Sequence, residues 1–117
     1  MTVPDDLKPD GAGARLWEAV AGPYELRPDE QVMLTEACRL TDLVDELRRT
    51  VEAEGLTVDG SKGQTVAHPL LTELRQVRGE LRLTLRQLEL PDPETGETYS
   101  TWHARRAARG RWANEAS

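Results

Sequence analysis

Residues 28–54 read PDEQVMLTEACRLTDLVDELRRTVEAE, a run in which apolar side chains recur at coiled-coil spacing. The apolar positions follow one another in steps of 4, 3, 4, 3 and 4 residues, and they are Met33, Ala37, Leu40, Val44, Leu47 and Val51. Steps that average 3.5 residues keep one seam of a helix facing a partner helix along its length. Pro28 suits the first turn of this helix and Gly55 suits its C-terminal cap.

A second long helix is predicted between His68-Pro69 and Pro91. Its apolar seam consists of Leu70, Leu74, Val77, Leu81 and Leu88. Gly79 in its middle costs about 1 kcal/mol relative to alanine, so we expect another helix to approach closely there. His68 is expected to cap the start of this helix.

The connection between the two long helices, residues 56–67, places LTV and QTV on either side of DGSKG. This pattern indicates two short extended pieces around a glycine-rich turn, and it lacks the spacing of a phosphate-binding P-loop. The predicted fold is therefore all-α: a short N-terminal helix and a long antiparallel helical hairpin, whose glycine-rich connection can form a short β-hairpin.

Before the hairpin, residues 14–21 are predicted to form the short helix, with Trp17 as the anchor that packs it onto the long helices. Residues 1–10 are polar and contain Pro4 and Pro9, which favours a mobile N-terminal arm. The predicted organisation is thus an arm over residues 1–10, a helical oligomerisation core over residues 11–91, and a polar, then arginine-rich tail over residues 92–117.

The apolar content is small for a chain of 117 residues, because phenylalanine is absent and aromatic residues make up 4%. A thin core often relies on oligomerisation. Some leucines also lie outside the seam, where a two-helix hairpin cannot bury them all. We expect neighbouring subunits to cover this surplus, with Leu34, Leu43, Leu71 and Leu85 as the oligomerisation residues.

No catalytic or metal-binding pattern appears in the sequence, so we expect neither an enzyme nor a bound cofactor or metal. The single cysteine, Cys38, is interpreted as a small buried apolar residue. The carboxylates of the first long helix are expected on solvated faces, and they are Glu36, Asp42, Asp45, Glu46 and Glu52. The N-terminus lacks the features of a signal peptide and no run is long enough to span a membrane, which predicts a soluble, cytoplasmic protein.

The net charge of −6 is unevenly distributed: residues 1–60 carry −8, residues 61–100 carry −1 and residues 101–117 carry +3. Within the second long helix, arginines spaced 3, 4 and 4 apart form a stripe consisting of Arg75, Arg78, Arg82 and Arg86. Like charges at this spacing repel one another, so the stripe is expected to face an acidic partner. The favoured partner is the acidic first helix, of this subunit or a neighbour, and the alternative is DNA phosphate.

A second basic group lies in the tail, where Arg105, Arg106, Arg109 and Arg111 are bracketed by Trp102 and Trp112. Arginine combined with tryptophan is typical of interface hot spots and of nucleic-acid contacts. The tail is therefore predicted to bind a partner, with Trp102 and Trp112 as partner-binding residues. The alternative is a disordered end that only adds solubility.

The chain resembles the small terminase subunits of tailed bacteriophages, specifically the P27-type family. The resemblance follows ordered short segments over residues 11–91. In the short helix and the first long helix, these are ARLWEAV at 14–20, YEL at 24–26, LTEACR at 34–39, and Asp42. After the first long helix they are GLTV at 55–58, Gly63, HPLL at 68–71, ELR at 73–75 and LELP at 88–91.

This resemblance implies a nonenzymatic, ring-forming component of the DNA-packaging motor in the host cytoplasm. Its implied partners are double-stranded viral DNA, the large terminase subunit that carries the ATPase and nuclease, and other copies of itself. The residues before the first long helix are too few for a separate helix-turn-helix domain. The DNA-binding candidates are therefore the two arginine groups, and the tail has the large terminase as its other possible partner.

The alternative function is a helical protein–protein adaptor that does not bind DNA. Its arginine stripe would lie inside an interface between proteins, and its tail would be a docking peptide.

Overall fold

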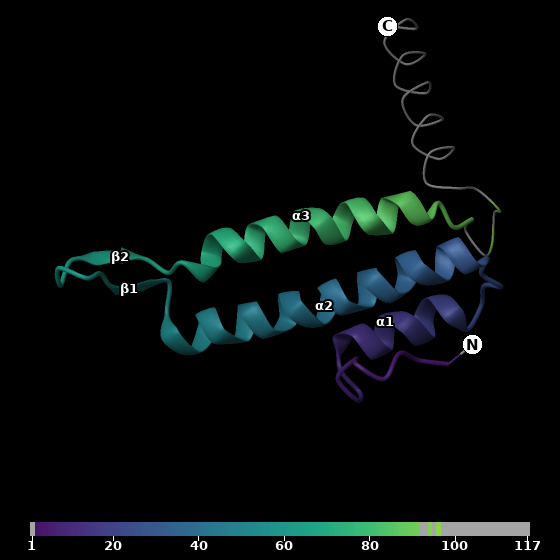
Figure 1. The fold of residues 1–117 in the computed structure, drawn as a ribbon, viewed down its shortest axis with the longest axis horizontal. Helices are drawn as coiled ribbons and strands as arrows, with labels where there is room; N and C mark the ends of the chain where they lie inside the picture. Colours follow the sequence, from purple (N-terminus) through teal and green to yellow (C-terminus); the bar gives the residue numbers. More distant parts are fainter. Residues whose placement is uncertain (1, 92–93, 95, 97–117) are drawn as a thin grey trace, which may run out of the picture.

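The computed structural model describes residues 2–91, 94 and 96. Its elements, in chain order, are α1 (Ala12–Ala21), α2 (Pro28–Glu54), β1 (Thr57–Asp59), β2 (Thr65–Ala67) and α3 (Leu70–Leu88). Figure 1 shows α2 and α3 running side by side in opposite directions, with the two strands at the tip of the hairpin. The short helix α1 lies along the N-terminal half of α2 (Figure 1). The predicted short helix and long helical hairpin are confirmed.

The seam between α2 and α3 is built from the residues that the spacing predicted. Leu40 and Leu47 of α2 are buried with Leu74 and Val77 of α3. The half-buried residues that pack against them are Val44, Leu70 and Leu81. Because each fully buried leucine or valine side chain stabilises the fold by about 1.5–3 kcal/mol, this seam is the main apolar contribution to the hairpin.

A second apolar cluster joins α1 to the N-terminal half of α2 and to the end of α3. Trp17 of α1 is 5% exposed and packs with Leu34 and Cys38 of α2, which confirms its predicted role as an anchor. Leu34 is fully buried, so it has no surface to offer a neighbouring subunit. Its assignment as an oligomerisation residue was therefore wrong, because α1 covers the side of α2 that carries it.

The start of α1 is held by a carboxylate of α2. The Asp42 carboxylate accepts hydrogen bonds from the backbone N–H of Gly13 at 2.8 Å and from that of Lys8 at 3.0 Å. Gly11, at the N-cap position, provides no side-chain cap, so Asp42 takes over that role. We expected Asp42 on a solvated face, and the structure shows instead that it caps a helix distant in sequence.

The same contact requires a glycine at position 13. A Cβ atom added to Gly13 would lie 2.4 Å from the Cys38 carbonyl oxygen and 2.9 Å from the Asp42 carboxyl group. Real Cβ atoms do not come so close to backbone atoms, so any larger residue would push α1 away from α2.

The N-terminal segment makes more contacts than a mobile arm would need. Leu7 is only 6% exposed and belongs to the cluster around Trp17. Asp6 pairs with Arg39 of α2, with 2.6 Å between the carboxylate and Nε. These contacts fasten residues 6–8 to the helices, because Leu7 is an apolar residue within reach of the α1–α2 cluster.

The connection forms the short β-hairpin that the sequence allowed. Strands β1 and β2 are antiparallel, and Val58 pairs with Val66 at their centre. His68 follows β2 and is 6% exposed. Its Nδ1 accepts a hydrogen bond from the Leu70 backbone N–H at 3.1 Å, which confirms the predicted cap. Since Nδ1 accepts, Nε2 is the protonated nitrogen, and it contacts the Glu54 carboxylate at the end of α2.

The end of α3 returns to the N-terminal cluster. Glu89 adopts the left-handed conformation with φ of 50°, which terminates the helix two residues before Pro91. Leu90 packs against the buried cluster around Trp17. The Tyr24 hydroxyl donates a hydrogen bond to the Pro91 carbonyl oxygen. The chain therefore leaves the helical core at a fixed point beside the C-terminal end of α1.

Gly79 does not lie at a close approach of helices within the part of the chain that the structure describes. A Cβ atom added there would meet nothing within 4 Å. The expected close contact was wrong for the single chain, because Gly79 lies on the side of α3 that faces away from α2.

We predict opposite effects for alanine at the two glycines. Gly13→Ala should lower the free energy of unfolding by about 1–3 kcal/mol, because its Cβ collides with the backbone of α2. The matched control, Gly79→Ala, should raise it by about 0.5–1 kcal/mol, because the added methyl group has room and alanine favours the helix. Urea denaturation followed by circular dichroism measures both. Equal effects at the two positions would contradict the close contact at Gly13.

Candidate nucleic-acid interface

The predicted arginine stripe lies along one flank of α3. Its members are all exposed, and we call them the arginine flank: Arg75, Arg78, Arg82 and Arg86. The flank is next to the face of α3 that packs on α2, because the 3.6-residue repeat of the helix places it beside Leu74 and Leu81. Guanidinium groups at this position can contact a partner that approaches α3 from the side.

The arginine flank does not pair with α2 of the same chain. Arg75, Arg78 and Arg82 form no ion pair with any residue that the structure describes. Several carboxylates of α2 instead pair with arginines of α2 itself, among them Asp45 and Glu52. Asp45 contacts Arg48 at 3.1 Å and Arg49 at 3.0 Å.

The expectation that the stripe faces the acidic helix of its own subunit was therefore wrong. The reason is local: α2 carries arginines three and four residues from its acidic residues, where helical neighbours meet. An acidic helix of a neighbouring subunit and DNA phosphate both remain as possible partners for the arginine flank.

These local pairs also shift the acidity of the carboxylates. The hydrogen bond from Arg48 holds the pKa of Asp45 below its ordinary value of 3.8, and the nearby charge of Arg49 acts in the same direction. The hydrogen bond from Arg39 likewise lowers the pKa of Asp6. All these groups are at the surface, where water screens their interactions, so each pair contributes little net stability.

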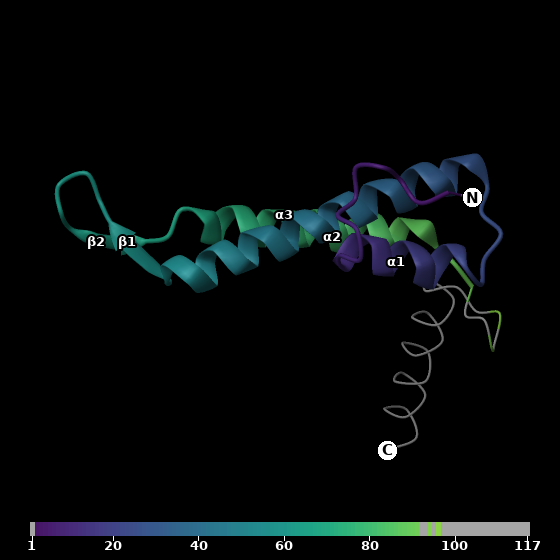
Figure 2. The same cartoon turned by 90° about the horizontal axis from the view of Figure 1, so that it is seen from below.

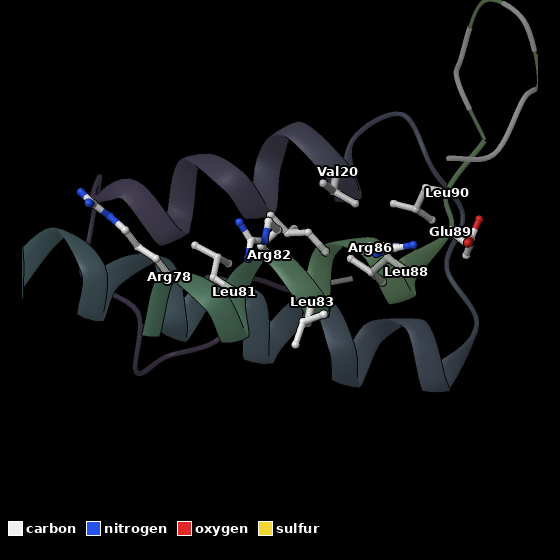
Figure 3. A pocket seen from close by; sticks show the side chains of 10 residues that line it. Val20, Arg78, Leu81, Arg82, Leu83, Arg86, Leu88, Glu89 and Leu90 are labelled. Carbon is white, nitrogen blue, oxygen red and sulfur yellow. The ribbon is translucent and has the colours of Figure 1, made fainter. Parts of the chain in front are cut away.

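An apolar groove runs beside the arginine flank, and Figure 3 shows its lining. Val20 of α1 forms one wall, and leucines of α3 and of the segment after it form the rest. We call it the leucine groove; its volume is about 510 Å³ and its lining residues are Val20, Arg78, Leu81, Arg82, Leu83, Leu85, Arg86, Leu88, Glu89 and Leu90. In Figure 3 the labelled arginines follow α3 along the groove while Val20 faces α3 from the opposite helix. The lining consists of leucines, one valine, three arginines and one glutamate, a composition that suits the binding of a partner with apolar and acidic groups.

A second hollow of about 430 Å³ lies next to the groove, around Gly79. Its lining residues are Leu71, Leu74, Arg75, Arg78, Gly79 and Arg82. Arg78 and Arg82 line both hollows, which we together call the trough, and leucines and arginines of α3 both contribute to its lining.

The groove was not predicted from the sequence, although part of its signal was visible. Leu85 had been noted as surplus to the seam, and it is 38% exposed on the groove wall. The other wall of the groove could not be predicted, because nothing in the sequence shows that Val20 lies across from α3. Leu43 is also exposed and Leu71 is half-buried, so both remain available as predicted oligomerisation residues.

The second predicted arginine group lies outside the residues that the structure describes. This applies to Trp102, Arg105, Arg106, Arg109, Arg111 and Trp112. Their assignments to DNA or to a protein partner stay predictions.

Cys38 is unsuited to act as a nucleophile. It is fully buried, and burial together with the nearby charge of Asp42 raises its pKa to about 11. Among residues 2–91, 94 and 96, no group of three histidine, cysteine or acidic side chains is arranged to hold a metal ion. Within the same residues, no helix combines the length and apolar character needed to cross a membrane.

Comparison with known protein families assigns the chain to one of them. A sequence model described as "Phage terminase, small subunit" matches residues 14–94, from α1 to just beyond α3. The chain belongs to the phage terminase small subunit family. No curated protein and no solved structure gave a significant match. The family assignment confirms the resemblance inferred from the ordered short segments, while the P27-type subgroup stays a prediction.

The buried thiol of this small terminase subunit makes a direct prediction. At pH 8 Cys38 is protonated as well as buried, so a chromogenic disulfide reagent should not modify it while the protein is folded. Modification should appear only as the protein unfolds, and its dependence on urea should follow the unfolding curve from circular dichroism. Rapid modification of the folded protein would contradict the burial of Cys38 beneath α1.

The lowered pKa of Asp45 predicts an acid-dependent loss of stability. Its ion pairs stabilise the folded state above the ordinary pKa of 3.8, and this stabilisation is lost as the pH falls through the lowered pKa. Arg48→Met should therefore make the free energy of unfolding less steeply dependent on pH below about pH 4.5. The control Arg75→Met removes an arginine that pairs with no carboxylate in the part of the chain that the structure describes, and it should keep the wild-type slope. Urea titrations at several pH values provide the measurement.

Proposed function

We propose that this protein is a nonenzymatic, ring-forming adaptor that binds viral DNA and recruits the large terminase during genome packaging in the host cytoplasm. The observation that carries the proposal is the family match over the whole helical core. The arginine flank supports it, because Arg75, Arg78 and Arg82 have guanidinium groups that no described residue neutralises. Such groups attract phosphate or carboxylate partners.

Ring formation would give these contacts their strength. The body of the chain is acidic, and one subunit offers only a few arginines to DNA. Several subunits that bind the same DNA molecule convert weak individual contacts into an intramolecular process with a high effective concentration. The candidate DNA contacts are the arginine flank and the tail arginines Arg105, Arg106, Arg109 and Arg111. Trp102 and Trp112 are candidate anchors for the large terminase.

A second candidate function, a protein–protein adaptor without DNA binding, is favoured by one feature of the trough. Exposed leucines line it together with the arginines of α3, and phosphate recognition has no use for these leucines. A protein partner with apolar and acidic side chains uses both kinds of residue.

The first experiment combines the mass of the native assembly with DNA binding. Light scattering after size exclusion should give one species several times the mass of a single chain. Its affinity for double-stranded viral DNA should fall linearly with salt concentration on logarithmic scales, because phosphate contacts release counterions. A monomer that does not bind DNA at low salt would contradict the proposal and favour the protein adaptor.

Substitution of the tail assigns the DNA contact. Replacing all four tail arginines with alanine should weaken DNA binding by about tenfold or more and leave the mass of the assembly unchanged. The matched control replaces the same four residues with lysine, which keeps the charge and should keep most of the affinity. If the alanine variant bound DNA normally and lost the large terminase instead, the tail would be a protein-docking segment.

A further inference from the structure

The leucine groove has the character of a binding site for a helix. Leu81, Leu85 and Leu88 give it an apolar floor, Val20 gives it a wall, and arginines stand along its edge. Amphipathic helices bind such grooves through apolar anchors, and their charged residues pair at the edge. The arginines outnumber the single glutamate of the lining, so the complementary helix would be acidic next to its apolar anchors.

The chain itself carries a helix face of this composition. On α2, the side turned away from both α1 and α3 carries residues that we call the α2 ridge: Val32, Glu36, Leu43 and Glu46. Arg39 lies on the same side and pairs with Asp6 of the N-terminal segment, and that segment borders the ridge at Val32 and Glu36. Val32 is 70% exposed and Leu43 is 39% exposed, although both are large apolar residues on a regular helix. In an α-helix, positions 32, 36, 43 and 46 fall on one side, since 3.6 residues complete a turn.

The charges of ridge and groove are opposite. The Glu46 carboxylate forms no ion pair with any residue that the structure describes. Glu36 has only a long contact of 3.8 Å with Arg39, which is itself held by Asp6. At the edge of the groove, Arg78 and Arg82 likewise form no ion pair with any residue that the structure describes. Each surface therefore offers the apolar and charged groups that the other requires.

The two surfaces do not face each other within one chain. In Figure 1 α2 lies between α3 and α1, while in Figure 2 both helices lie below the N-terminal half of α2 and the N-terminal segment crosses above it. The groove is lined by Val20 of α1 and by residues of α3. The α2 ridge is on the other side of α2. A contact between ridge and groove must therefore join two molecules.

We propose that the leucine groove of one subunit binds the α2 ridge of the next. This inference rests on the proposed ring-forming function and names the surfaces that build the ring. A contact between two different surfaces is heterologous, and it generates a closed ring when the rotation between subunits closes. In this arrangement Arg78 and Arg82 contact the neighbouring subunit, and Arg75 and the tail arginines remain for DNA.

A charge exchange tests the proposed contact. Arg82→Glu and Glu46→Arg should each raise the concentration at which the assembly dissociates by about tenfold or more, because each brings like charges together. The double variant restores opposite charges and should return the dissociation concentration to within about threefold of the wild type. Light scattering over a dilution series measures all three proteins. Circular dichroism checks that they are folded, as expected for exposed positions.

Two controls match the charge changes outside the contact. Arg75→Glu reverses an arginine of the same helix beyond the leucine groove, and Glu80→Arg reverses a glutamate elsewhere on α3. Both should keep the wild-type assembly. Arg75→Glu should also weaken DNA binding, which separates the two uses of the arginine flank.

The apolar half of the contact has its own test. Leu85→Ser removes an exposed leucine from the groove and should weaken the assembly. Leu56→Ser removes a leucine next to the β-hairpin that is even more exposed, at 67% against 38% for Leu85, and should have no effect.

The outcomes separate this inference from the proposed function. If the wild type forms a large DNA-binding assembly that Arg82→Glu and Glu46→Arg leave intact, the groove–ridge contact is wrong and the packaging adaptor stands. If the single variants dissociate but the double variant does not recover, the pairing of these two residues is wrong. A wild type that is monomeric at every concentration overturns both.

Discussion

The contact between Asp42 and the start of α1 fixes the position of α1 on the α2–α3 hairpin. One carboxylate of α2 accepts hydrogen bonds from the backbone of Gly13 and Lys8, and the missing side chain of Gly13 lets the two helices meet there. Because α1 is fixed in this way, Trp17 and Leu34 become core residues, and Val20 is carried to its place opposite α3. Gly11 provides no side-chain cap for α1, and Asp42 of α2 accepts the hydrogen bond instead. This contact helps to hold Val20 at the leucine groove.

Much of the fold was predictable because its signals are local. The seam follows from apolar spacing, and the ends of α2 follow from Pro28 and Gly55. The β-hairpin follows from short apolar pieces around glycines. The misplaced residues depend on contacts between distant segments instead. Asp42 and Leu7 acquire their roles only when α1 packs on α2, and Asp42 lies 29 residues from Gly13 in the sequence. The spacing of apolar residues within one helix does not show which distant segment will pack against it.

The candidate site was predictable to a similar extent. Spacing alone placed the arginines on one flank of α3, and the structure confirms that they are exposed there. They form no ion pair with the acidic helix of the same chain, because the total charge of a helix does not show which of its carboxylates are already paired. Arg48 and Arg49 already neutralise Asp45, which leaves fewer carboxylates available than the acidic composition of α2 indicates. The groove itself needs two elements that are far apart in sequence, so only the three-dimensional structure reveals it.

The hydrogen bond from Tyr24 to the Pro91 carbonyl oxygen fixes the place where the chain leaves the helical core, so the two ends of the molecule differ. The chain leaves its core beside the C-terminal end of α1, while the β-hairpin marks the opposite end of the long helices (Figure 1). In a ring built from identical subunits, every such exit point would fall on the same rim. The β-hairpins of all subunits would likewise lie at equivalent positions, at the opposite end of the long helices from Pro91. A partner that docks on the assembly would therefore meet two chemically different faces, so loading would have a defined direction.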